Sequence, residues 1–189
     1  FVDPTPANAT FTTNKSVLIN ISISNSSNLT EIKWSWNNTN FTLYNSSLIL
    51  FYNFDNRSSL GENDTRILDL SMNRNNGTPT SEQAAPPPIW NESGGKYGGA
   101  YEFDGIDDII RSQNNFDYSA NTSYTMVAWA RPRATFNGRI ISVGGGLQTG
   151  DFGMLNNNGV SQCDLMAGGL SIVLSGPTFT NGVYSRVVC

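Results

Sequence analysis

The segment that most constrains the fold is the glycine-rich stretch 94–111, with the sequence GGKYGGAYEFDGIDDIIR. Its first half has the composition of a turn. In its second half Glu102 and Asp104 fall on one side of the chain and aromatic residues fall on the other, which is the two-residue period of a β-strand. Gly105 interrupts that period, and Asp107 and Asp108 come before a second apolar run. The segment therefore predicts a β-hairpin whose turn presents carboxylates.

The composition supports an all-β protein. The chain has 189 residues, enough for one sandwich or two small domains. It is rich in glycine, asparagine, serine and threonine and lacks helix-forming runs of leucine, alanine and glutamate, which favours strands joined by turns. The net charge is -4 without a basic stripe, so nucleic acid is not an expected partner. No apolar run approaches the length of a transmembrane helix.

Acceptor triplets for N-glycosylation, Asn-x-Ser/Thr, are unusually dense. There are thirteen, ten of them within the first 65 residues, where the composition of the chain predicts about five in total. Polar loops are rich in these residue types in any case, but the excess remains after composition is allowed for. We expect a heavily N-glycosylated extracellular protein. The acceptor residues are Asn8, Asn14, Asn20, Asn25, Asn28, Asn37, Asn40, Asn45, Asn56, Asn63, Asn76, Asn91 and Asn121.

Alternating and densely apolar runs predict two domains. Residues 1–46 contain three short predicted strands, and we interpret them as a small separate β module, with extension of the main sandwich as the alternative. Residues 47–189 form the larger domain. It opens with an apolar run at 47–55 that predicts a central strand. The run 123–130 is apolar on both faces and predicts another inner strand, and the sequence 156–159, NNNG, predicts a hairpin. The three N-terminal strands are expected at 16–24, 31–36 and 41–44.

Three blocks resemble one known family. The pattern G-x-x-G-x-A-x-x-F-D-G-x-D-D-x-I from Gly95 to Ile110 is similar to that of laminin G-like, concanavalin A-like jelly rolls of surface proteins. The turn at 68–78 and the run at 123–132, which ends in W-x-x-P, resemble two further blocks of that family in the same order. The resemblance implies an antiparallel jelly-roll sandwich over 47–189. The strands of 1–46 more loosely resemble the end of an immunoglobulin-like module.

The resemblance also implies that the jelly roll is incomplete, because the last segment, 181–189, corresponds to a strand near the middle of that domain. Two explanations stay open. Either the sequence is a fragment of a longer protein, or the remaining strands come from another subunit, since an open sheet edge invites strand addition.

Oxygen-rich turns are candidate Ca²⁺ sites, because calcium prefers carboxylate, carbonyl and amide ligands. Some members of the family hold calcium at a rim loop. The candidate ligands are Asp69, Asn73, Asp107 and Asp108. In the alternative interpretation the first two cap their own turn through side-chain to backbone hydrogen bonds, and the last two are solvated.

Other chemistry has weaker support. The absence of histidine excludes Ser-His-Asp and Cys-His nucleophiles. A glycosidase needs two facing carboxyl groups. Glu102, Asp104 and Asp107 superficially resemble the E-x-D-x-x-E strand of jelly-roll glucanases, but an aspartate stands where the acid should be. We therefore do not expect an enzyme. Aromatic and amide groups that suit a glycan-binding rim, with ordinary packing as the alternative, are Trp90, Tyr97, Tyr101 and Asn75.

The two cysteines, Cys163 and Cys189, are expected to form an intramolecular disulfide in an extracellular protein. Free buried thiols or an intermolecular bridge are the alternatives.

The expected function is structural or adhesive, at the cell surface, with other copies of the chain or neighbouring surface proteins as partners and filament assembly as one form of it. A calcium-assisted, carbohydrate-binding lectin is the alternative, and a glycoside hydrolase is a distant third.

Overall fold

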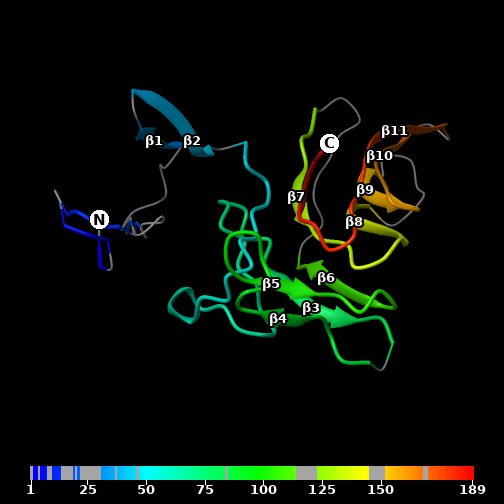
Figure 1. Ribbon diagram of the computed structural model, residues 1–189, viewed down its shortest axis with the longest axis horizontal. Coiled ribbons are helices and arrows are strands. Elements are labelled where there is room, and N and C mark those ends of the chain that lie inside the picture. Colours follow the sequence, from blue (N-terminus) through cyan, green and yellow to red (C-terminus); the bar gives the residue numbers. More distant parts are fainter. Residues whose placement is uncertain are drawn as a thin grey trace. The chain divides into compact units, whose positions relative to one another are not determined.

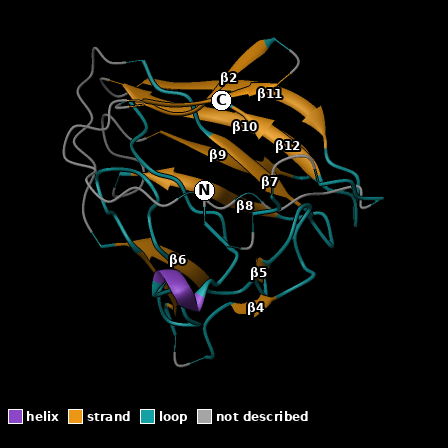
Figure 2. Cartoon of the chain, turned by 90° about the vertical axis from the view of Figure 1, so that its left-hand side faces the viewer, coloured by secondary structure: helices purple, strands orange, loops and turns teal. Residues whose placement is uncertain are grey.

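The computed structural model describes residues 2–3, 5–7, 10–13, 19, 21, 31–36, 38–45, 47–83, 85–113, 123–144, 152–167 and 170–189. These residues form antiparallel β-sheets and no α-helix, and the one helical element is a short 3-10 turn, η1, at Ser58–Leu60 (Figures 1 and 2). This confirms the all-β prediction. None of these residues forms a helix that is long and apolar enough to cross a membrane. The chain divides into two compact units, Phe1–Ile49 and Leu50–Cys189.

The described residues of the first unit include a β-hairpin. Strands β1 (Glu31–Trp36) and β2 (Thr39–Asn45) pair antiparallel, as expected for two of the three N-terminal strands. Asn38 lies in the connection with a left-handed φ of 61°, which asparagine adopts more readily than most residues. The third predicted strand, at 16–24, lies almost wholly outside the described residues; Ile19 and Ile21, which are described, are not in a strand.

The second unit is built on a four-stranded antiparallel sheet in the order β11-β10-β9-β8. The predicted NNNG hairpin joins β9 to β10: Asn158 and Gly159 have φ values of 49° and 89°, the left-handed pair that a two-residue hairpin turn needs. That prediction is confirmed. The strands are β8 (Asn137–Val143), β9 (Phe152–Asn157), β10 (Val160–Ala167) and β11 (Leu170–Thr178).

A two-stranded ribbon, β7 (Val127–Ala130) with β12 (Ser185–Val188), packs on this sheet. The shared core centres on buried Met154, Phe179 and Val187 and includes partly buried side chains of β7 and β8. The prediction that the run 123–130 forms an inner strand because it is apolar on both faces is wrong. Val127 and Trp129 are 54% and 45% exposed, because only the Met126–Ala128–Ala130 face meets the core.

The central segment forms two further ribbons. Strand β3 (Gly77–Ser81) pairs with β6 (Asp108–Ser112), and β4 (Ile89–Asn91) pairs with β5 (Ala100–Glu102). The expected hairpin between β5 and β6 is therefore wrong. The five-residue connection between them presents carboxylates as predicted, but it directs β6 to a different partner strand.

The apolar run 47–55 does not form the central strand that its composition predicts. The backbone partners of Phe51 are in the turn that begins at Asp69. Its N–H donates to the Asp69 carboxylate over 2.9 Å, and its carbonyl accepts the Leu70 N–H over 2.9 Å. A strand requires backbone hydrogen bonds that repeat along a partner strand, and a single turn cannot supply them. The run therefore has an irregular backbone and belongs to no sheet.

A disulfide joins Cys163 of β10 to Cys189, directly after β12. The intramolecular pairing is confirmed, and it ties the β7–β12 ribbon to the four-stranded sheet. Such a bond lowers the conformational entropy of the unfolded chain, and for a loop of 26 residues this stabilises the fold by about 3.5 kcal/mol.

Replacing either Cys163 or Cys189 with serine should lower the free energy of unfolding by about 2–4 kcal/mol. Urea unfolding of each single variant and of the double variant measures the loss. Because the same disulfide bond is removed in all three variants, they should lose the same free energy of unfolding. A loss in the double variant equal to the sum of the two single losses would contradict the pairing.

Candidate metal-binding turn

The turn between β5 and β6 is shaped by its own aspartates. The Ile106 N–H donates to Asp104 Oδ1 and the Asp104 N–H donates to Asp108 Oδ2, each over 2.8 Å. Gly105 between them has a φ of 81°, a conformation that glycine adopts without a Cβ penalty. The FDGIDD sequence thus folds into a tight turn because carboxylates satisfy its backbone donors.

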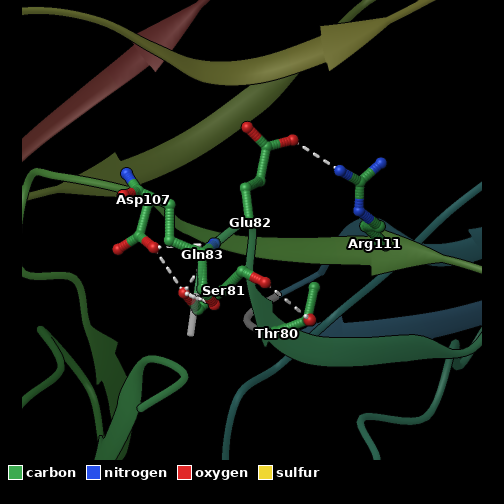
Figure 3. A network of polar contacts seen from close by, with 6 residues as sticks. All are labelled: Thr80, Ser81, Glu82, Gln83, Asp107 and Arg111. Atoms are coloured by element: carbon green, nitrogen blue, oxygen red, sulfur yellow. Dashed lines mark hydrogen bonds and ion pairs between the residues drawn. The ribbon is translucent and has the colours of Figure 1, made fainter. Parts of the chain in front are cut away.

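Asp107 fixes this turn to the end of β3 (Figure 3). Its Oδ2 accepts the Ser81 hydroxyl over 2.5 Å and the Gln83 N–H over 2.9 Å, and its backbone carbonyl accepts the Glu82 N–H. An exposed ion pair between Glu82 and Arg111, 2.5 Å long, lies beside this network. The turn is therefore held by the β3–β6 ribbon as well as by its own hydrogen bonds.

The geometry gathers three carboxylates. One oxygen from each of Asp104, Asp107 and Asp108 lies within 4.8 Å of the others. Oδ1 of Asp107 and Oδ1 of Asp108 are both buried and have no hydrogen-bond partner among the described residues. Burying such oxygens without a partner is unfavourable, and a bound cation is one partner that could satisfy them. The cluster could hold a metal ion, with backbone carbonyls or water completing the six to eight oxygens that calcium takes.

Asp69 and Asn73 do not join this cluster. The Asp69 carboxylate is 6% exposed and accepts the backbone N–H groups of Phe51, Ser71 and Asn75, each over 2.9 Å, and the Ser71 hydroxyl over 2.7 Å. The Asn73 N–H in turn donates to the Ser71 hydroxyl over 3.2 Å. For Asp69 this is the turn-capping arrangement that the sequence offered as the alternative to ligation, whereas the Asn73 contact is made by its backbone N–H.

The expected glycan-contacting side chains are spread between surface and interior. Tyr97 is 79% exposed and meets Trp129 edge to face, with ring centroids 5.5 Å apart. Tyr101 and Asn75 are 8% and 6% exposed, so they pack inside the fold. The Trp90 indole N–H donates to the Phe54 carbonyl over 2.9 Å, which fixes a ring that is partly exposed.

The polar partners of Glu102 lie outside the acidic turn. It accepts a hydrogen bond from Asn91 Nδ2 over 2.9 Å and pairs with Arg133 over 2.7 Å. The hydrogen bond from Asn91, and then that from Arg133, lower the pKa of this carboxyl. A general acid needs a raised pKa, so the environment of Glu102 does not favour that role.

The structure brings two of the four predicted ligands, Asp107 and Asp108, together with Asp104. Asp104 is not among the predicted ligands, although all three residues belong to the same F-D-G-x-D-D pattern. Comparisons with protein-family models, curated proteins and solved structures find no match for this chain.

Two tyrosines, the half-buried Tyr52 and the buried Tyr101, are expected to make stability sensitive to alkaline pH. Tyr52 donates its hydroxyl to the Asn75 carbonyl over 2.5 Å, next to the Asp69 turn. Burial raises the pKa of Tyr52 to about 12, with a hydrogen bond from Ser112 opposing the shift and the Asp69 charge adding to it. Burial likewise raises the pKa of Tyr101 to about 12.

A raised folded-state pKa favours the neutral phenol, so its contribution to stability is complete below pH 10 and is lost as the pH rises from 10 through 12. Urea midpoints measured across this range should fall steeply for the native sequence and less steeply for Tyr52→Phe. Tyr97→Phe is the control, because Tyr97 is exposed. Equal slopes for all three proteins would contradict the role of Tyr52.

Proposed function

We propose that this chain is an extracellular, heavily N-glycosylated β-protein that serves a structural or adhesive role at a cell surface. The density of acceptor sequons, thirteen in 189 residues, carries the proposal. The disulfide between Cys163 and Cys189 supports it, because such bonds persist outside the reducing cytosol. A sugar coat of this density would protect a permanent surface protein from proteolysis and from unspecific association.

We also propose that the second unit is a laminin G-like jelly roll and that the first belongs to an immunoglobulin-like module. Antiparallel pairing throughout the described strands supports both assignments. The three sequence blocks support the first more specifically.

Self-association through β11 is part of the proposal. In the described structure β11 pairs on one side only, with β10, and its Ile172, Val173 and Leu174 are 50%, 47% and 67% exposed. Its sequence, LSIVLSGPT, contains no charged residue. A long, uncharged, apolar edge strand is a surface for pairing with another strand, and two copies can pair there without repulsion between like charges.

Electron microscopy of the native, glycosylated material tests this role. Ordered fibres or regular arrays should appear, and Val173→Lys should abolish them because a charge on the edge strand opposes pairing. Leu60→Lys is the matched control, since Leu60 is also exposed, at 51%, but lies in η1. Dispersed particles at every concentration would contradict self-association and leave a monomeric adhesive module.

Calcium-assisted carbohydrate binding is the second candidate, and the acidic turn is the observation that favours it. Two buried carboxylate oxygens without partners, on Asp107 and Asp108, suit a hard divalent cation. A cation there would tie the β5–β6 turn to the end of β3 and could order a ligand-binding rim.

Calcium should raise the melting temperature of the protein, and a chelator should reverse the rise. Asp104→Asn should weaken this response, because it removes one charge from the cluster without touching the Asp107 network. Glu92→Gln, the same change at an exposed residue of a different turn, should leave it intact. An unchanged melting temperature with calcium would contradict the site, and a glycan panel would then test sugar binding alone.

A further inference from the structure

We propose that the fold selects among its own sequons, so that Asn63 carries an N-linked glycan while Asn56 and Asn91 do not. The inference rests on the proposal that this chain is N-glycosylated, and it states which of the acceptor residues carry sugar. It follows from the hydrogen bonds of three side-chain amides, all in the second unit.

Asn63 presents an amide that is oriented and free to react. It lies at the base of a two-residue turn, where the Asn63 and Arg66 backbones exchange hydrogen bonds of 3.1 and 3.0 Å. Its side-chain Oδ1 accepts the N–H and hydroxyl of Thr65, the third sequon residue, over 2.9 and 2.8 Å. Its Nδ2 makes no hydrogen bond within the described part of the chain. The sequon is thus pre-shaped with its reactive nitrogen unengaged.

The surroundings of Asn63 leave room for a glycan. Residues 57–66 are all exposed except Glu62, which is 3% exposed. The Glu62 carboxylate accepts the N–H groups of Arg57 and Leu68 over 2.7 and 3.2 Å, so one buried side chain anchors the whole loop. A sugar on Asn63 therefore extends from a fixed, solvent-facing turn and displaces no packed side chain.

Asn91 has the same sequon geometry as Asn63, but its Nδ2 is hydrogen-bonded. Its Oδ1 likewise accepts the N–H and hydroxyl of the third sequon residue, Ser93, over 3.0 and 3.4 Å. Its Nδ2, however, donates to Glu102 Oε1 over 2.9 Å. Glu102 is itself held by Arg133, so the acceptor is a fixed carboxylate on the neighbouring strand β5. Asn91 is also only partly exposed.

Asn56 is held in the same way. Its Nδ2 donates to Asp64 Oδ1 over 2.8 Å. Asp64 is the middle residue of the Asn63 sequon. The loop that presents the Asn63 amide therefore also binds the Asn56 amide.

The chemistry explains why a carboxylate on Nδ2 matters. N-glycosylation forms a bond between Nδ2 and C1 of an oligosaccharide activated as a phosphate or diphosphate ester. The bond from C1 to the phosphate oxygen breaks, that oxygen leaves with the electron pair, and Nδ2 loses one proton to a base of the transferase. The nitrogen must enter the transferase site, so an amide bound by Glu102 or Asp64 must first be released. Hydrogen bonds to charged groups of this kind change an equilibrium by about tenfold or more.

Site-resolved glycopeptide mass spectrometry of the native protein tests the inference. The fraction of Asn63 that carries glycan should exceed the fractions at Asn56 and Asn91 by about tenfold or more. Comparable glycan on Asn91 or Asn56 would overturn the selection by the fold and leave the glycoprotein proposal standing. Absence of glycan from every sequon would overturn both.

Variants made in the native host separate the carboxylate effect from sequon identity. Glu102→Ala frees Asn91 Nδ2 and should raise its occupancy, with Asn63 unchanged as the internal reference. Ser93→Thr gives Asn91 the same third residue as Asn63 and should leave the difference in place. If Ser93→Thr equalises the two sites and Glu102→Ala has no effect, the identity of the hydroxyl residue governs occupancy and the inference is wrong.

Discussion

The carboxylate of Asp69 is the interaction on which the central part of the second unit depends. It is buried, and it gathers backbone donors from Phe51, Ser71 and Asn75 with one hydroxyl. These bonds close the turn that leads into β3 and hold the irregular run before η1 against it. Strand β3 then pairs with β6, and its end receives Asp107. The acidic turn is thus positioned by a carboxylate that belongs to a different turn and makes no part of the cluster.

This arrangement distinguishes a structural carboxylate from a candidate metal ligand, which the sequence alone could not do. Asp69 and Asp107 both occur in oxygen-rich turns. Both carboxylate oxygens of Asp69 accept hydrogen bonds from protein donors, whereas Asp107 and Asp108 each keep a buried oxygen without a partner among the described residues. Hydrogen-bond satisfaction, which depends on long-range contacts such as Phe51 to Asp69, distinguishes a structural carboxylate from a candidate ligand.

Local sequence signals predicted local structure well. The NNNG turn, the strand at 31–36 and the tight FDGIDD turn depend on neighbours in sequence. Strand partners did not follow, because β5 pairs with the strand before it, β4, while β6 pairs with the more distant β3. Composition alone made 47–55 look like a strand. Gly153 shows a further limit. It sits between Arg139 and Asp164, where an added Cβ would lie 2.2 Å from the guanidinium, so its role in admitting that ion pair depends wholly on sheet register.

The proposed glycoprotein is tested most directly by the intact mass of the native chain before and after removal of N-linked glycans. These 189 residues account for 20.6 kDa of polypeptide. A clear fall in the native mass on deglycosylation, with asparagine converted to aspartate at the occupied sites, is the predicted result. A native mass that deglycosylation leaves unchanged would contradict the account.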